Sequence, residues 1–239
     1  MQGDKRLIVA LDAPDMDRVA CLVETIGDAV SYYKVGMELY YSEGSKVISY
    51  LRGLDKEIFL DLKLHDIPNT VARGLSSLTT LGASMLNVHA SGGLRMMEAA
   101  RRSVAEKAAE LGIARPKLIA VTILTSIDET EWVNLRHDKN IAEYVVHLAQ
   151  LAQCAGIDGV VASPQEAAAI RAACGDNFII VTPGVRPQGA AVNDQSRIAT
   201  PAGALKNGAH HLVVGRPITA ATDPRSAALA ILREMREKG

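Results

Sequence analysis

Eight short apolar runs alternate with longer segments of helical periodicity along the 239 residues of the chain. These runs are predicted strands at Leu7–Leu11, Tyr32–Met37, Ile58–Leu62, Met85–Val88, Leu118–Leu124, Gly159–Ala162, Phe178–Val181 and His211–Val214. Most are apolar at every position, which is typical of parallel strands buried on both faces. The helical segments include Met16–Ile26, Gly93–Ala109, Ile141–Cys154, Pro164–Ala173 and Pro201–Lys206. Eightfold alternation predicts an α/β protein of the (β/α)8 TIM-barrel class, with residues 1–239 as a single domain.

A doubly wound open sheet is the structural alternative to the barrel. Its usual phosphate fingerprint, G-x-G-x-x-G after the first strand, is absent, since Asp12-Ala13-Pro14-Asp15 follows the first strand here. The chain shows no linker, low-complexity tract or block of like charge that would divide it. Its length fits one barrel, because such barrels run to about 250 residues.

Composition narrows the function classes. Hydrophobic residues make up 48% of the chain and charged residues 22%, and the formal net charge is −1. This balance is ordinary for a globular protein and argues against a general nucleic-acid or membrane surface. Any anionic ligand therefore needs a local cluster of donors.

The cysteines and the N-terminus indicate a cytoplasmic protein. Cys21, Cys154 and Cys174 are far apart and form no CxxC pair, as expected for thiols in a reducing compartment. The first residues lead straight into a predicted strand, so we expect no signal peptide. No apolar run reaches the roughly 18 residues of a membrane span.

Charged residues gather where the first three strands end. Asp12 ends the first strand, Lys34 lies near the end of the second, and Asp61 and Lys63 lie at the end of the third. Because strand side chains alternate faces, Asp61 and Lys63 are expected to project together, with Cα atoms roughly 6.5–7 Å apart. One such pair is often structural, but four charges of alternating sign at neighbouring strand ends favour a catalytic site.

Two later segments suit a phosphate ligand. Gly215-Arg216-Pro217 follows the last strand and offers backbone N–H groups and a guanidinium. The long polar loop after the seventh strand resembles a lid, and its candidate ligand contacts are Arg186, Gln188, Gln195 and Arg197. The plain alternatives are a simple turn with a surface arginine and a surface excursion. We predict no metal site, because no pair of histidines has suitable spacing.

The stretch Asp61-Leu62-Lys63-Leu64-His65-Asp66-Ile67-Pro68-Asn69-Thr70 resembles the signature of the orotidine 5′-monophosphate decarboxylase family. The resemblance runs along nearly the whole chain. It includes Leu11-Asp12, Lys34-Val35-Gly36, His89-Ala90-Ser91-Gly92-Gly93, Leu124-Thr125-Ser126, Thr182-Pro183-Gly184-Val185-Arg186-Pro187 and Gly215-Arg216-Pro217-Ile218.

The resemblance implies decarboxylation of orotidine 5′-monophosphate to uridine 5′-monophosphate, the last step of de novo pyrimidine synthesis, without a cofactor. Lys63 is implied as the proton donor, with Lys34, Asp61 and Asp66 completing an alternating Lys–Asp–Lys–Asp array. A fixed ammonium suits this chemistry, because loss of CO2 leaves an in-plane carbanion that no carbonyl group stabilises by resonance.

The remaining expectations from the resemblance concern substrate binding and assembly. The implied substrate contacts are Asp12, Lys34, Asp61, Ile67, Thr70, Thr125, Ser126, Pro183, Arg186, Gln188, Gln195, Gly215 and Arg216. Asp12 and Lys34 are implied to hold the ribose, Ser126 the pyrimidine edge, and Gln188, Gly215 and Arg216 the phosphate. A homodimer is implied as well, in which Asp66 and Thr70 reach into the active site of the other subunit.

Two rival functions remain open at this stage. A Mg2+-dependent sugar-phosphate decarboxylase or aldolase would share the Asp-x-Lys-x-x-Asp core, but would carry an acidic metal ligand at the position of Lys34. An ammonium there would repel the metal ion. A non-catalytic phosphate-binding barrel is the second rival, although a binder has no need of the costly Asp61–Lys63 pair.

Overall fold

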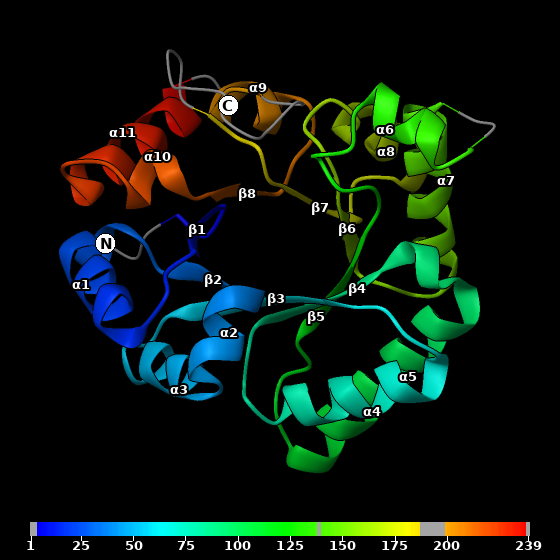
Figure 1. Cartoon of the computed structure of the whole chain (residues 1–239), viewed down its shortest axis with the longest axis horizontal. Coiled ribbons are helices and arrows are strands. Elements are labelled where there is room, and N and C mark those ends of the chain that lie inside the picture. The colour runs from blue at the N-terminus through cyan, green and yellow to red at the C-terminus, as the bar shows by residue number, and fades with distance from the viewer. Residues whose placement is uncertain (1–3, 138–139, 187–198, 238–239) are drawn as a thin grey trace.

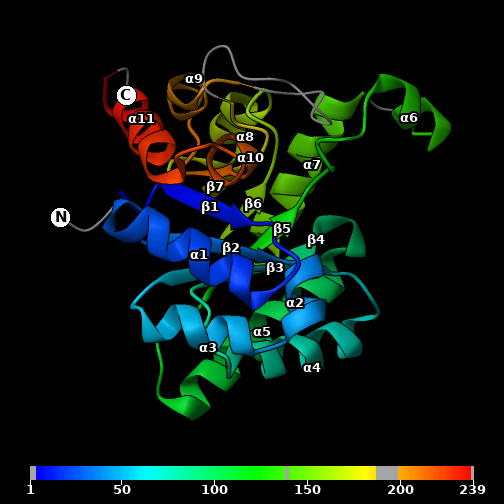
Figure 2. The same ribbon diagram turned by 60° about the vertical axis from the view of Figure 1, so that its left-hand side comes forward.

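The computed structural model describes residues 4–137, 140–186 and 199–237. Eight parallel strands pair in chain order and close into a barrel, because the last strand also pairs with the first. Helices surround this barrel on the outside (Figures 1 and 2). The predicted TIM barrel is therefore confirmed.

The strands are short and the helices vary in length. The strands are β1 (Leu7–Leu11), β2 (Tyr32–Gly36), β3 (Glu57–Leu64), β4 (Met85–His89), β5 (Lys117–Val121), β6 (Gly159–Val161), β7 (Ile179–Thr182) and β8 (His211–Val214). The helices are α1 (Met16–Ile26), α2 (Met37–Glu43), α3 (Lys46–Gly53), α4 (Pro68–Thr79), α5 (Leu94–Leu111), α6 (Glu129–Asn134), α7 (Ile141–Cys154), α8 (Ala167–Cys174), α9 (Pro201–Lys206), α10 (Arg216–Thr219) and α11 (Pro224–Glu237). Two 3-10 turns lie at Gly27–Ala29 and Ala90–Gly92.

Six predicted strand ends need correction, those of the fourth, sixth and seventh strands by one residue each. The second strand ends at Gly36, because Met37 already begins α2, and the fifth ends at Val121 although its apolar run continues to Leu124. Beyond Val121 the chain is a loop, in which Leu124 is 40% exposed and lines a cavity. The third strand extends two residues beyond the predicted end, to Leu64.

The apolar side chains form two separate cores. One fills the inside of the barrel and consists of Ile8, Ala10, Tyr32, Phe59, Met85, Ile119, Val181 and Val213. The larger core lies between the strands and the helices. Strand side chains alternate faces, so runs such as β1, buried at all five positions, supply both cores at once.

The barrel wall is tight on the side of β6 and β7. A Cβ atom on Gly159 would clash with the carbonyl oxygen of Ile179, so only glycine fits there.

The N-terminus of α7 is capped by Asn140, whose side chain accepts a hydrogen bond from Glu143 N–H. In the described ranges, no helix is long and apolar enough to cross a membrane.

Candidate active site

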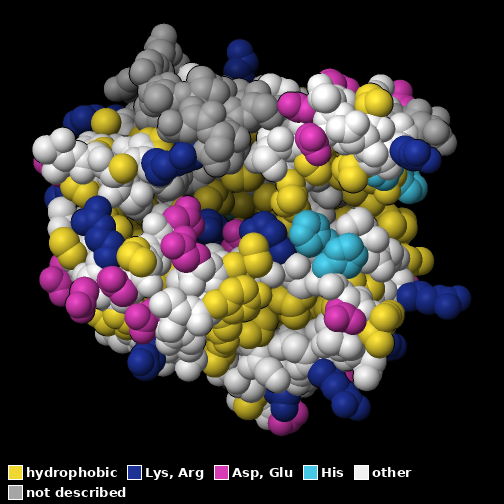
Figure 3. Space-filling model, viewed as in Figure 1, with side chains coloured by type: hydrophobic (Ala, Val, Ile, Leu, Met, Phe, Trp, Pro, Cys, Tyr) yellow, Lys and Arg dark blue, Asp and Glu magenta, His cyan; other side chains and the backbone are white. Residues whose placement is uncertain are grey.

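A cavity of about 290 Å³ opens at the carboxyl ends of the strands. Its charged and polar walls include Lys34, Asp61, Lys63, Thr125 and Ser126, and its apolar walls include Phe59, Val121, Ile123, Leu124, Val161, Pro183 and Val213. Figure 3 shows the hollow in the middle of this face, with charged side chains at its floor and histidines beside it. Six residues predicted from scattered motifs therefore line one cavity.

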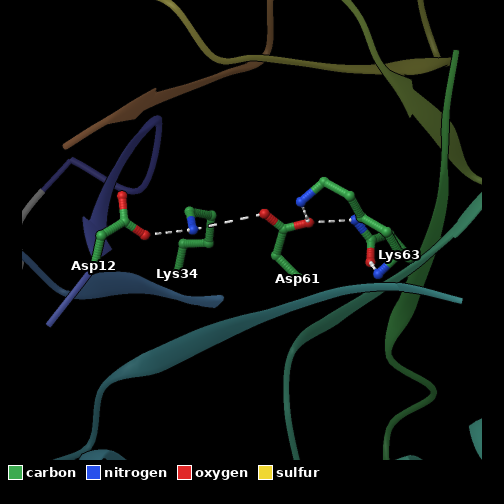
Figure 4. A network of polar contacts seen from close by, with 5 residues as sticks. Asp12, Lys34, Asp61 and Lys63 are labelled. Atoms are coloured by element: carbon green, nitrogen blue, oxygen red, sulfur yellow. Dashed lines mark hydrogen bonds and ion pairs between the residues drawn. The ribbon is translucent and has the colours of Figure 1, made fainter. Parts of the chain in front are cut away.

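Four charged side chains lie in a row along one side of the site (Figure 4). Lys34 Nζ lies 3.0 Å from Asp12 Oδ1 and 3.6 Å from Asp61 Oδ2. The other oxygen of Asp61, Oδ1, accepts a hydrogen bond of 2.7 Å from Lys63 Nζ. The Asp61 carboxylate thus bridges two ammonium groups, one through each oxygen.

Lys34 and Asp61 stay ionised because each is paired with oppositely charged groups. Burial alone would raise the pKa of Asp61, but Lys34 and Lys63 and the hydrogen bonds it accepts outweigh burial and keep its pKa below the ordinary value. Burial likewise opposes the charge of Lys34, yet Asp61 and Asp12 hold its pKa above the ordinary value. Lys34 and Asp61 therefore stay charged at neutral pH although both side chains are nearly buried.

Neighbouring backbone leaves room for the Lys34 ammonium. A Cβ atom at Gly36 would lie 2.9 Å from Lys34 Nζ and 3.6 Å from Asp12 Oδ1. Glycine at this strand end therefore lets the Lys34–Asp12 pair form directly over the backbone.

The third strand is irregular where it carries the site. Leu60 pairs with Leu86 of β4, but the next pairing joins Leu64 to Val88, and Lys63 has a left-handed φ of 51°. Asn87 of β4 lies in this gap. Its Oδ1 accepts from Lys63 N–H at 2.8 Å, and its Nδ2 donates to Asp61 Oδ1 at 2.6 Å.

The candidate phosphate residues lie around the ends of β7 and β8. A Cβ atom on Gly215 would lie 3.5 Å from Asp12 Oδ2, which places this glycine beside the charged row. Arg186 is buried, and its Nε has no hydrogen-bond partner among the described residues. Burial and the nearby Arg216 guanidinium lower the pKa of Arg186. Two guanidinium groups close together, one with an unused donor, suit an anion.

Three residues of the family motif lie away from this cavity within the chain. Asp66, Ile67 and Thr70 are exposed, and none of them lines the cavity. Ile67 is 67% exposed, and Asp66 accepts a hydrogen bond from the N–H of Ile67. The row of charges in one chain is therefore Asp12–Lys34–Asp61–Lys63, and Asp66 is not part of it.

Some predicted ligand contacts lie outside the described residues, and some residues of the site were not predicted from the sequence. Gln188, Gln195 and Arg197 lie outside the described residues. The sequence does not identify Asn87 as a partner of Lys63 and Asp61, because the pairing of β3 with β4 produces no pattern among neighbouring positions of the sequence. The apolar wall, with Phe59 and Val213, was also missed because these residues read as strand core.

Known proteins resemble this chain along nearly its whole length. The family model described as orotidine 5′-phosphate decarboxylase / HUMPS family matches residues 5–231. The chain is 48% identical over 236 residues to an orotidine 5′-phosphate decarboxylase of Moorella thermoacetica, covering 98% of this chain and 94% of that protein. It is 44% identical to the one of Nostoc sp., with 98% of both covered.

A solved structure shows the same arrangement of the chain. The crystal structure of orotidine 5′-phosphate decarboxylase from Lactobacillus acidophilus superposes with a TM-score of 0.86 at 41% identity. That comparison covers 98% of this chain and 100% of the other.

Proposed function

Because the chain belongs to the orotidine 5′-phosphate decarboxylase family, we propose that it converts orotidine 5′-monophosphate to uridine 5′-monophosphate and CO2. This is the last step of de novo pyrimidine synthesis. The observation that carries the proposal is the Lys63–Asp61–Lys34 row, whose three side chains line a cavity of about 290 Å³.

Lys63 is the proton donor in this proposal. The bond between C6 of the pyrimidine and its carboxyl carbon breaks, and the electron pair stays at C6. One N–H of the Lys63 ammonium then gives its proton to C6, and solvent returns a proton to the amine. A fixed cation beside C6 stabilises the carbanion as it forms, which lowers the barrier before the proton moves. No cofactor takes part.

Asp61 and Lys34 hold the Lys63 ammonium in position for this step. The Asp61 carboxylate holds the Lys63 ammonium from one side, and Lys34 fixes the other oxygen of that carboxylate. An anionic Asp61 beside the substrate carboxylate also repels it, and that repulsion disappears when CO2 leaves. Asp12 and Lys34 are proposed to hold the ribose hydroxyl groups.

Binding of the remaining substrate is divided between two walls. Ser126 and Thr125 are proposed to contact the pyrimidine edge, with Pro183 packing on the ligand, since all three line the cavity. Gly215, Arg216, Arg186 and the residues Gln188 and Gln195 are proposed to hold the phosphate. Binding energy gained at the phosphate, remote from the breaking bond, then orients C6 against Lys63.

A metal-dependent sugar-phosphate enzyme of related sequence is the second candidate. It would need acidic ligands near the end of β2, where Lys34 instead pairs with two aspartates. Among the described residues, no three His, Cys, Asp or Glu side chains are grouped as a metal site. A cationic residue at that place favours the nucleotide reaction.

The test is the loss of orotidine 5′-monophosphate, followed by ultraviolet absorbance with a chelator present. We expect turnover that the chelator leaves unchanged. Turnover only after addition of Mg2+ and a ketose phosphate would support the second candidate, and nucleotide binding without any turnover would support a non-catalytic barrel.

We also propose that the active protein is a homodimer in which Asp66 and Thr70 complete the partner's site. Their exposure, and that of Ile67, suits residues that become buried only in an assembly. Nearby, Met37 and Tyr41 are 43% and 72% exposed along a groove with Leu62 and Leu64. Large apolar side chains exposed together are typical of an interface.

Mixing two inactive variants tests this shared site. In a hybrid of Asp66→Asn and Lys63→Ala subunits, one of the two sites regains both native residues. Equal mixing with free exchange should therefore restore about a quarter of the sites, since a C2 dimer contains two equivalent ones. Confirmed subunit exchange without recovered activity would contradict the shared site.

A further inference from the structure

The backbone between the two catalytic charges is irregular, and a single side chain of the next strand fills the irregularity. The pairing Leu60–Leu86 is followed by Leu64–Val88, so three residues of β3 stand opposite one residue of β4, Asn87. Such a bulge re-aims the side chains of the longer strand. Here the re-aimed residues are Asp61 and Lys63.

Asn87 supplies the hydrogen bonds that the interrupted ladder lacks. Its Oδ1 accepts from Lys63 N–H at 2.8 Å, which satisfies the backbone of a residue held at a φ of 51°. A lysine adopts such a conformation only when its surroundings impose it. Asn87 is 1% exposed, so these bonds form away from water.

The amide of Asn87 also fixes the Asp61 carboxylate. Nδ2 donates to Asp61 Oδ1 at 2.6 Å, the same oxygen that accepts from Lys63 Nζ at 2.7 Å. With Oδ1 held between these two donors, Oδ2 faces Lys34 at 3.6 Å. One side chain therefore sets both the backbone of Lys63 and the orientation of its counter-ion.

We propose that Asn87 is a positioning residue for decarboxylation, which holds the Lys63 ammonium and the Asp61 carboxylate in their reactive arrangement without touching the substrate. Asn87 is absent from the cavity wall, which is why it acts only through its two neighbours. This inference rests on the proposed function. The alternative is an ordinary buried hydrogen bond that stabilises the barrel and nothing else.

Two variants of nearly equal size separate these roles. Asn87→Leu removes both hydrogen bonds. We expect kcat to fall about 100-fold, because displacement of a catalytic group by about 1 Å has an effect of that order. The affinity for uridine 5′-monophosphate, measured by calorimetric titration, should change less than about threefold, since the cavity wall is intact.

Asn87→Asp keeps the acceptor for Lys63 N–H but replaces the donor with a second carboxylate beside Asp61. Two adjacent carboxylates retain one proton to higher pH than either alone. The other charged or titratable groups facing this pair are Lys34, Lys63 and His89, and they are the same in both proteins. When the introduced carboxyl group is protonated, its O–H restores the bond to Asp61. The rate of Asn87→Asp relative to the native protein should therefore rise as the pH is lowered.

Thr122→Val is the matched control. Thr122 lies directly after β5, is 2% exposed, and donates its hydroxyl to Val161 O at 3.0 Å. Loss of this buried hydrogen bond should leave kcat within about threefold of the native value, although it lowers stability.

The outcomes distinguish this inference from the proposed function. A native protein without turnover refutes both. If the native protein turns over and the kcat of Asn87→Leu lies within threefold of the native value, the positioning role alone is refuted. The same conclusion follows if Asn87→Leu loses nucleotide affinity by as large a factor as kcat, or if Thr122→Val loses as much kcat as Asn87→Leu. Should Asn87→Leu fail to fold, Asn87→Asp decides: a relative rate independent of pH overturns the proposal.

Discussion

Two aspartates with largely buried side chains, at opposite ends of the barrel, form ion pairs of different kinds. The side chains of Asp61 and Asp158 are 10% and 13% exposed, and pairing keeps the pKa of each below its ordinary value although burial opposes this. Asp158 lies just before β6, where it receives both Nη atoms of Arg115, at 2.6 and 2.8 Å, and the N–H of Leu118. Asp61 instead receives two lysines at the cavity.

The difference lies in what the partner cations can still do. The planar guanidinium of Arg115 matches both oxygens of Asp158, and it does not lose a proton in proteins. An ammonium has three N–H donors, and that of Lys63 spends one of them on Asp61. The Arg115–Asp158 pair at the amino end is therefore purely structural. The Lys63–Asp61 pair at the carboxyl end instead leaves N–H donors of the ammonium available to a ligand in the cavity.

The largest expected effect comes from removal of Lys63. Lys63→Ala should lower kcat at least about 1,000-fold, since a positioned general acid contributes roughly 100- to 10,000-fold and the ammonium also stabilises the carbanion. Stopped-flow or steady-state absorbance assays measure this loss.

Lys117→Ala is the control at the other end of the barrel, where the Lys117 ammonium lies 3.9 Å from Asp158 and is half-exposed. Its rate should equal that of the native protein. If Lys63→Ala retained most of the native rate, the proposed proton donor would be wrong.

The second effect should be one of stability rather than rate. Asp158→Asn leaves the Arg115 guanidinium without its counter-ion, and we expect a loss of about 2 kcal/mol in the free energy of unfolding, because breaking a buried pair is costly but Arg115 is partly exposed. Urea denaturation gives this value. An unchanged kcat is expected from the same preparation, and a large loss of rate would contradict a purely structural role for this pair.

The smallest expected effect is a pH dependence of the free energy of unfolding, to which histidines at both ends of the barrel contribute. Burial lowers the pKa of His89 near the site and of His210 and His211 at the amino end. The folded protein thus binds fewer protons than the unfolded chain below about pH 6.5, so the free energy of unfolding should fall as the pH drops below that value.

The slope of this decline is at most about 1.4 kcal/mol per pH unit for each proton. Urea denaturation between pH 5 and pH 8 measures it, and His211→Gln should flatten the curve. A stability that rose on acidification would contradict these assignments. At lower pH, the depressed pKa values of Asp61 and Asp158 predict a further loss as those groups become protonated.

Much of the site was predictable because its signals are local. The alternation of apolar and helical segments placed Asp12, Lys34 and Asp61 at strand ends, and the family motif marked Lys63. The predicted contact between Asp61 and Lys63 is present, but the assumed regular strand is wrong. The contact forms across a bulge in which Lys63 has a positive φ.

The amino-acid sequence by itself determined the barrel and the identity of its charged residues, because strand and helix periodicities and strand-end charges are properties of neighbouring positions. Only the tertiary structure decided how those charges are held. Asn87 meets Asp61 from 26 residues away, and Arg115 meets Asp158 from 43 residues away. Such contacts depend on the register between strands, and register follows from packing of the whole barrel rather than from any local pattern.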